Sequence, residues 1–408
     1  MMTSTETSPA ALAGGPAQSV KVDMRLLAMV LVLLAIWIAF GASTGGTFLT
    51  ARNLFNLSLQ VAVVGIMSTG MVLIIVSRHI DLSVGSQVGF IGVAGALVQT
   101  QLMSLENPAG WWVSSLAMLV TGGLIGALQG ALIAYVGIPS FVVTLGGLMF
   151  FRNAAYLLNQ GKTISPLNAT FQLLGGGLNG SVGAFWSWVL GILAVAGVWA
   201  YVVRGRRRRR QHNFPTRPLA LDATIAIVWS VVIVGFVMVM NAFLQPTTHV
   251  PMGIPIPVLI LIGVGLLMTA IARKHRFGRH VFAVGGSPES AALAGIDTRR
   301  LTFQLFVLMG VLCGLASIVV TARLDAAASV TGTMMELSVI AAAVIGGTSL
   351  SGGVGTIAGG LLGALIMQSL QSGMILMGIS TPLQNMILAA VLILAVLIDM
   401  IYRKARRI

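Results

Sequence analysis

Charged side chains and cysteine are what this sequence has least of. Only 8% of its 408 residues are charged and 57% are hydrophobic, whereas soluble domains carry about 25% charged residues. Most of such a surface cannot face water, so a soluble globular fold is excluded. The single cysteine, Cys313, lies in an apolar run. It excludes an internal disulfide and gives no support for zinc or thiol chemistry.

Acidic residues and catalytic groupings are scarce as well. The chain has 10 Asp and Glu residues, and its 5 His residues are scattered in or beside hydrophilic stretches. Nothing in this pattern resembles a catalytic constellation, so we do not expect an enzyme. Interior carboxylates are too few for an obvious proton relay, which weakens an ion-coupled mechanism without eliminating it.

A nucleotide-binding loop is also missing. Gly161-Lys162-Thr163 resembles the end of a phosphate-binding loop, but that motif needs a glycine five residues before Gly161, where Tyr156 stands. The segment also lies in a predicted outer loop, away from cytoplasmic ATP. We therefore expect no cofactor on this chain, and if ATP drives the protein, a separate chain must hydrolyse it.

Basic residues are plentiful, and their positions predict the topology. The 24 Lys and Arg residues give a formal net charge of +14, and most of them lie in four hydrophilic stretches beside apolar runs. These stretches are 21–25, 204–217, 273–300 and 403–407. Basic residues that flank spans mark the cytoplasmic side, so both termini are expected there. The run 206–210 also suits RNA or anionic lipid, but we interpret it as a topology anchor and expect no nucleic-acid partner.

Long apolar runs make up most of the remaining sequence and predict membrane-spanning helices. A spanning helix needs about 20 apolar residues. The runs cover residues 26–43, 56–77, 84–103, 111–136, 139–158, 183–203, 221–244, 256–272, 302–322, 336–346, 355–378 and 383–401. The predicted fold class is an all-α polytopic membrane protein with about 12 transmembrane segments (10 to 12). The run 336–346 is too short to cross unaided and is a candidate half-helix.

Hydrophilic stretches divide the chain into a membrane domain and its appendages. Residues 1–23 are polar and rich in Ser, Thr, Ala and Pro, and we interpret them as a disordered cytoplasmic tail rather than a signal peptide. The transmembrane domain covers 24–402, and 403–408 form a basic cytoplasmic tail. Residues 273–301 are the longest charged segment between spans. Ser287 is expected to cap a short helix there, at the cytoplasmic face.

Two glycine-bearing breaks interrupt apolar segments at corresponding places in the two halves of the chain. The first is Asp81-Leu82-Ser83-Val84-Gly85-Ser86, and the second covers residues 346–355. Such interruptions are the best sequence indication of a translocation site. Unwound backbone at membrane depth survives only inside protein or beside a water-filled cavity. We therefore interpret both breaks as hinges or pathway lining.

Six motifs follow one another along the chain. They are 80–86 (IDLSVGS), 139–145 (PSFVVTL), 277–286 (FGRHVFAVGG), 291–296 (AALAGI), 322–324 (ARL) and 344–355 (VIGGTSLSGGVG). In this order they resemble the permease subunits of bacterial ABC importers for ribose, xylose and related sugars, over almost all of residues 45–400. Residues 45–53 (GGTFLTARN) and 139–152, with an inserted pair of spans and an Arg-rich loop within 170–254, resemble the xylose branch.

That resemblance implies a multi-pass permease of the bacterial inner membrane, surrounded by lipid and paired with a second permease copy. It also implies an ATPase with two nucleotide-binding cassettes, which holds ATP and Mg²⁺, and a periplasmic sugar-binding protein. Residues 278–296 would dock in a groove of the ATPase. The segment Ser287-Pro288-Glu289-Ser290-Ala291-Ala292 is one residue longer than the family pattern, which bears on the ATPase contacts. Ser338 replaces a usual Asp, which bears on substrate preference.

The candidate site residues form two groups. The ATPase-coupling candidates are Gly278, Gly285, Gly286, Glu289, Ala291, Ala292, Gly295 and Ile296. The pathway or gate candidates are Asp81, Ser83, Gly85, Ser86, Ser140, Thr144, Arg152, Gly346, Gly347, Thr348, Ser349, Gly352 and Gly353.

The charged residues within or beside apolar runs each have two open interpretations. Asp81 either caps the next span with the help of Ser83 or acts directly at the pathway. Arg152 either reaches the outer surface or faces the interior and holds a loop or a sugar hydroxyl. Arg323, Asp325 and Glu336 are either solvated turn residues, the interpretation we favour, or they pair with one another or meet a docking protein.

The sequence thus predicts import of a monosaccharide, xylose or a related pentose, by alternating access driven by a separate ATPase. One alternative is an ion-coupled secondary sugar transporter. Another is a structural or lipid-scrambling membrane protein.

Overall fold

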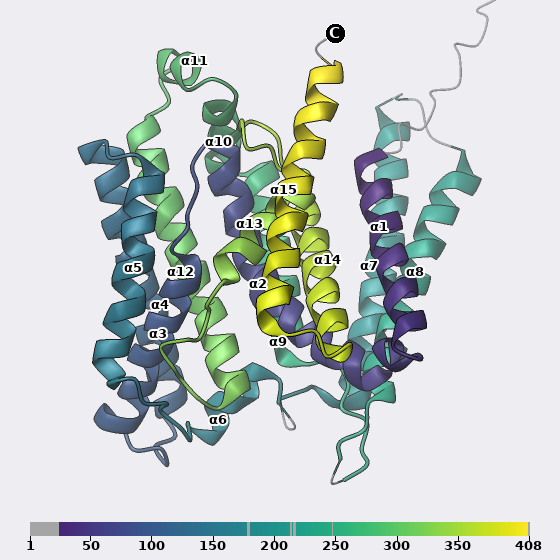
Figure 1. The fold of residues 1–408 in the computed structure, drawn as a ribbon. Coiled ribbons are helices and arrows are strands. Elements are labelled where there is room, and N and C mark those ends of the chain that lie inside the picture. Colours follow the sequence, from purple (N-terminus) through teal and green to yellow (C-terminus); the bar gives the residue numbers. More distant parts are fainter. Residues whose placement is uncertain (1–23, 178–179, 213, 215–217, 247, 407–408) are drawn as a thin grey trace, which may run out of the picture.

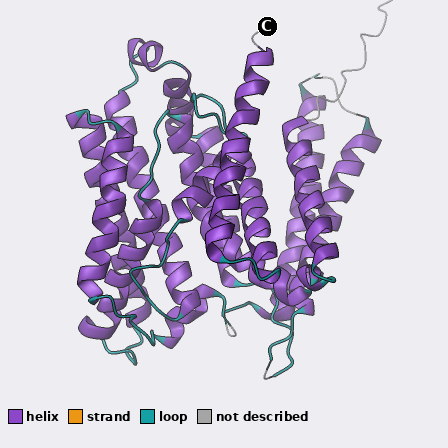
Figure 2. Ribbon diagram, viewed as in Figure 1, coloured by secondary structure: helices purple, strands orange, loops and turns teal. Residues whose placement is uncertain are grey.

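The computed structural model describes residues 24–406 except 178–179, 213, 215–217 and 247, and these residues fold into a helical bundle (Figures 1 and 2). The predicted tail 1–23 lies outside the described residues. Three isolated β-bridges join loops, and the described residues contain no longer strand. The predicted all-α fold class is confirmed.

Fifteen α-helices are described. Their bounds are α1 (Met24–Ser43), α2 (Ala51–Val76), α3 (Val84–Leu97), α4 (Gly110–Ala131), α5 (Ser140–Asn159), α6 (Ala169–Gln172), α7 (Gly183–Gln211), α8 (Leu219–Ala242), α9 (Ile256–Lys274), α10 (Arg276–Gly286), α11 (Pro288–Leu293), α12 (Thr298–Leu324), α13 (Met335–Ile345), α14 (Ile357–Leu376) and α15 (Thr381–Arg406). Each predicted apolar run matches one of these helices. Nine helices of the described part are long and apolar enough to cross a membrane alone.

The bundle has two ends, which printed contacts distinguish. At one end, the N–H of Gly353 donates to the carbonyl oxygen of Val76, the last residue of α2, and Gly285 of α10 lies against both groups. We call this end the α10 side. At the other end, the side chain of Gln99, which follows α3, accepts a hydrogen bond from the N–H of Asn168, which precedes α6. We call this end the α6 side; it is the lower end in Figure 1.

Two crossings combine a non-helical stretch with a short helix. Residues 77–83 leave the α10 side, and α3 completes the path to the α6 side. Residues 325–334 leave the α6 side, where Asp325 accepts a hydrogen bond from the N–H of Leu167 (2.8 Å), and α13 completes the return. The nine long helices, α15 and these two segments together account for the twelve predicted apolar runs. The run 336–346 is therefore a crossing half-helix, as its length suggested.

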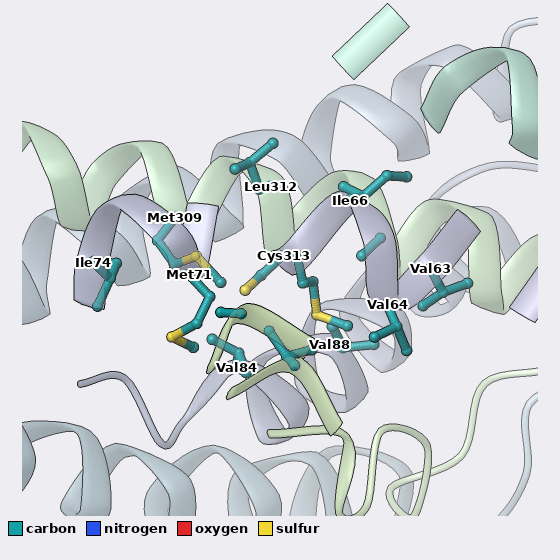
Figure 3. Packing of buried hydrophobic residues seen from close by; sticks show 14 of the residues in the cluster. Val63, Val64, Ile66, Met71, Ile74, Val84, Val88, Met309, Leu312 and Cys313 are labelled. Atoms are coloured by element: carbon teal, nitrogen blue, oxygen red, sulfur yellow. The ribbon is translucent and has the colours of Figure 1, made fainter. Parts of the chain in front are cut away.

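The core lies around α2 and α12, which are buried over most of their length. Figure 3 shows Met71 of α2, Val84 and Val88 of α3, and Met309 and Cys313 of α12 within one apolar cluster. Cys313 is a buried free thiol that acts as part of this packing.

Small residues let α4 and α12 approach closely. Gly122 and Gly126 on α4 follow the spacing of one helical turn, as do Gly310 and Gly314 on α12. A Cβ at Gly122 would overlap the carbonyl oxygen of Gly310, and a Cβ at Gly310 would overlap that of Gly122. Close backbone approach of this kind is the usual source of helix association in lipid.

Helices α7 and α8 form a hairpin at the edge of the bundle. They pack mainly on each other, and α8 reaches α2 through Val237 and Met240, which join an apolar cluster with Phe55 and Leu59. Few other residues of the hairpin are buried. This hairpin is the inserted pair of spans within 170–254, and it meets the rest of the bundle at α2 and α9.

Candidate functional site

The two half-helices begin against each other inside the bundle. A Cβ at Gly85, in the first turn of α3, would overlap the carbonyl oxygen of Gly332 and the Oε2 atom of Glu336. A Cβ at Gly332, which has a φ of +82°, would overlap the carbonyl oxygen of Gly85. Only glycine leaves room for this contact. The starts of α3 and α13 therefore meet, with the N–H ends of both helices directed into the protein.

The extended stretch before α3 is held by two neighbouring helices. The hydroxyl of Thr144 on α5 lies 2.8 Å from the carbonyl oxygen of Ser140 and 3.3 Å from that of Ile80. The N–H of Ile80 lies 3.5 Å from the hydroxyl of Ser140. On the other side, the His79 ring lies 3.5 Å from the Thr302 hydroxyl of α12. Two predicted pathway residues, Ser140 and Thr144, thus position the unwound backbone.

Ser83 is the centre of a buried polar network. Its hydroxyl donates to Asp81 Oδ1 (2.6 Å) and accepts from the amides of Gln87 (2.7 Å) and Gln129 (2.9 Å). The Gln87 amide also reaches Gln129 Oε1 at 3.1 Å, and all four side chains are 3% exposed or less. Gln129 lies on α4, so the network fixes the start of α3 to α4.

Asp81 does not cap α3. Its Oδ1 atom accepts from the N–H of Ser83 (2.9 Å), one residue before the helix, and Ser83 itself makes no capping bond. This arrangement is an Asx-turn, which orders the approach to the helix instead. The capping interpretation is therefore wrong in its geometry, although Asp81 and Ser83 do act together.

Removing the Ser83 hydroxyl is expected to destabilise the folded protein. Ser83→Ala leaves Asp81 Oδ1 with only a backbone donor and takes a shared acceptor from two buried amides, at a cost of about 2 kcal/mol. The thermal midpoint of the detergent-purified protein measures this loss. Ser86→Ala is the matched control, because its hydroxyl donates only to the carbonyl oxygen of Ser83 in its own helix. Equal midpoints for the two variants would contradict the network.

Buried polar atoms without hydrogen-bond partners gather near the contact between the starts of α3 and α13. Among the described residues, Asp81 Oδ2, Glu336 Oε2, Gln87 Oε1 and Arg152 Nη2 are buried and have no hydrogen-bond partner. Glu336 is only 5% exposed, so the interpretation of it as a solvated turn residue is wrong. Arg152 is half-buried and its Nη2 atom is fully buried, which favours an inward-facing Arg152. Such groups are the kind that hold a polar solute.

The second glycine-bearing break lies elsewhere, at the α10 side. Residues 346–356 connect α13 to α14 there, with buried Thr348 and Ser349 and with Gly347, Gly352 and Gly353 at positive φ. The segment that meets the first break is 329–336, centred on Gly332. The two breaks therefore do not lie together. The half-helix that meets the first break is α13, which comes before the second break in the chain.

The second break instead meets α2 and α10 at a junction built around Arg78. Its Nε atom donates to the carbonyl oxygen of Gly285 (2.8 Å) and its Nη2 atom to that of Gly286 (2.7 Å). Arg78 has a φ of +66°, an uncommon conformation for a side-chain-bearing residue. A Cβ at Gly352 would lie 2.5 Å from Arg78 Cγ. We call Arg78, Gly285, Gly286, Gly352 and Gly353 the Arg78 junction.

Helices α10 and α11 form the outer layer at this end (Figure 1). The predicted short helix is present as α11, and the Ser287 hydroxyl caps it by accepting from the N–H of Ser290 (3.2 Å). Glu289 is exposed, and Leu293 is 91% exposed on its surface. Ala291 is only 4% exposed, so it packs inward and does not form an outward contact.

Of the remaining coupling candidates, one packs α10 against α9 and the others lie at or near the surface. Gly278 lies against the backbone of α9, where a Cβ would overlap the Ile271 carbonyl oxygen. Ala292 is exposed, Gly295 ends α11 at a φ of +81°, and Ile296 is half-buried. Helix α10 was not foreseen in the sequence, although buried Val281 and Val284 show its inward face.

Taken together, these features define a multi-spanning membrane permease. Two unwound segments meet inside its bundle, and the Arg78 junction connects them to short helices at one surface. The chain belongs to the family described as "Branched-chain amino acid transport system / permease component", which matches residues 53–396.

Named relatives cover nearly the whole chain. It is 35% identical to the xylose transport system permease protein XylH of Haemophilus influenzae over 383 residues, 93% of this chain and 96% of the relative. It is 31% identical to the ribose import permease protein RbsC of Escherichia coli over 370 residues, 90% and 92% of the two chains. The L-arabinose ABC transporter permease protein AraH of Azospirillum brasilense is 32% identical over 360 residues, 88% and 83%. No solved structure matches.

Proposed function

We propose that the chain is the permease subunit of an ATP-driven importer for a monosaccharide, xylose or a related pentose. The sugar relatives support the substrate class, although the family description names branched-chain amino acids. In this proposal a second permease copy, an ATPase with two nucleotide-binding cassettes and a periplasmic sugar-binding protein complete the importer. ATP and Mg²⁺ bind to the ATPase alone.

The α10 side is the cytoplasmic side in this proposal. The basic end of α7 and the C-terminal end of α15 lie there (Figure 1), which agrees with the tendency of Lys and Arg to stay in the cytoplasm. Both termini are then cytoplasmic in the bacterial inner membrane. The exposed surface of α11 faces the ATPase, and the α6 side faces the sugar-binding protein.

The Arg78 junction is the observation that carries the proposal. Displacement of α10 moves Gly285 and Gly286, which hold Arg78 through two hydrogen bonds. Arg78 begins the stretch that leads to α3, and Gly353, bonded to Val76, belongs to the stretch that follows α13. A push on α11 therefore reaches both half-helices through the Arg78 side chain and the backbone contacts around it. Coupling through differential stability of two states then needs little sugar affinity in the permease itself.

A substitution on α11 tests the direction of coupling. Leu293→Asp is expected to reduce co-purification of the ATPase by about 10-fold, because it places a charge in an apolar contact at the interface. Membrane insertion should be unchanged, since Leu293 makes no interior contact. Leu105→Asp, at an exposed leucine between α3 and α4 on the α6 side, is the matched control and should leave the ATPase bound. Retention of the ATPase by Leu293→Asp would remove the docking assignment.

An ion-coupled secondary transporter is the alternative mechanism, and no relative named above supports it. It predicts uptake that survives ATP depletion and stops with an uncoupler. The proposed importer shows the reverse pattern. Measuring both conditions in the same cells separates the two mechanisms.

A further inference from the structure

A cavity of about 750 Å³ lies between the last turns of α7 and the first turns of α8, outside the transport machinery. Glycines on α7 leave this space open: a Cβ at Gly197 or Gly205 would meet nothing within 4 Å. Neither glycine has the positive φ that would require it. Neither the packing of the hairpin nor the backbone conformation therefore requires glycine at these two positions.

The cavity wall is strongly basic at one end. Arg204, Arg206, Arg208 and Arg209 of α7 line it. Arg204 and Arg208 are four residues apart and share one face of the helix. The only carboxylate among its lining residues is Asp222 of α8, which pairs with Arg206 at 3.2 Å. A large positive charge thus faces the cavity, and one ion pair offsets only part of it.

The other end of the cavity is apolar. Gly197, Val202 and Ile225 line it there, below the arginines. Helix α7 has 29 residues and is about 43 Å long at 1.5 Å per residue, whereas the hydrocarbon layer is about 30 Å thick. If the layer begins near Gly183, it ends near residue 203. The apolar end then lies at acyl-chain depth and the arginines at headgroup depth.

We propose that this cavity binds an anionic phospholipid, with the headgroup phosphate among Arg204, Arg208 and Arg209 and the acyl chains along Gly197 and Ile225. Arginine is well suited to phosphate because its planar guanidinium donates two parallel hydrogen bonds. The apolar end distinguishes a lipid from a free anion or an RNA, neither of which has acyl chains to place there. The inference is independent of the transported substrate.

Native mass spectrometry of the full-length protein with phosphatidylglycerol tests this site. Arg208→Gln with Arg209→Gln removes two cavity arginines, and retained lipid should fall about 10- to 30-fold. Arg207→Gln with Arg210→Gln is the matched control, since it removes the same charge from the same turns but touches no lining residue. The control should retain lipid as the unaltered protein does. Equal loss in both variants, or no loss in either, would overturn the site.

Competition identifies the ligand. Inorganic phosphate or an RNA oligonucleotide, added in excess over the lipid, should leave phosphatidylglycerol bound, and phosphatidylcholine should bind more weakly. Displacement of the lipid by free phosphate would show a simple anion site, and displacement by RNA would show a nucleic-acid surface. Either result would overturn the proposal.

Discussion

Replacing Arg78 with alanine is expected to reduce ATP-driven sugar uptake by about 100-fold or more while the ATPase stays bound. The substitution removes two hydrogen bonds from a charged group to the carbonyl oxygens of Gly285 and Gly286. Such bonds contribute about 1.5–3 kcal/mol each, and each 1.4 kcal/mol corresponds to about a factor of ten. Because α11 is untouched, the defect should lie in coupling and not in assembly.

Uptake and sugar-stimulated ATP hydrolysis are measured together in proteoliposomes. Loss of uptake with continued basal hydrolysis and a bound ATPase would indicate a positioning role for Arg78, and the lost hydrogen bonds should also lower the thermal midpoint. Arg78→Lys, which offers one donor group instead of a fork, should give an intermediate rate. Arg279→Ala is the control, because Arg279 lies on α10 and donates only to the carbonyl oxygen of Lys274. Unchanged uptake in Arg78→Ala, or loss of the bound ATPase together with uptake, would contradict the coupling role.

Alanine at Gly85 is expected to abolish transport and to lower the stability of the fold by about 3 kcal/mol or more. The added methyl group would overlap the Gly332 carbonyl oxygen and Glu336 Oε2, and backbone cannot yield as a flexible side chain does. The starts of α3 and α13 must then separate. Fluorescence-detected size-exclusion chromatography across a temperature series measures the stability change.

Gly146→Ala is the matched control for the contact between α3 and α13. Gly146 is also a helical glycine, on α5, but a Cβ there would meet nothing within 4 Å. It should change the midpoint and uptake little. A Gly85→Ala protein that folds and transports as well as Gly146→Ala would show that the two half-helices do not need to touch.

The sequence predicted the membrane helices well because lipid leaves few choices. A backbone surrounded by hydrocarbon must satisfy its own hydrogen bonds, so each apolar run becomes a helix. The half-helix at 336–346 followed from its length alone. The short helix at the α10 side followed from Ser287 and Pro288, which are local signals.

Long-range contacts were beyond the reach of the sequence. Gly85 and Gly332 are far apart in the chain, and nothing in either local pattern indicates that they touch. Gly332 stands alone among Thr residues, whereas 346–355 holds several glycines and therefore attracted the prediction. Arg78 and Gln129 were missed for the same reason, since their partners belong to other helices.

The remaining errors concern residues that were predicted at a surface but are buried. Ala291 and Glu336 lie beside turns in the sequence, and both were placed at surfaces. Folding packs α11 on α10 and α12 and brings the start of α13 against α3, so both residues are buried. The predicted roles of the other pathway candidates stay predictions. They are supported by the positions of four residues near the contact between α3 and α13, which are Asp81, Ser140, Thr144 and Arg152.

Uptake of labelled xylose into proteoliposomes that contain the chain, its ATPase and its sugar-binding protein tests the central claim most directly. The account predicts uptake that requires ATP, both partner proteins and an intact Arg78, that persists with an ionophore, and that unlabelled leucine does not inhibit. Sugar uptake by the chain alone under an ion gradient, or ATP-driven uptake of leucine instead of sugar, would contradict it.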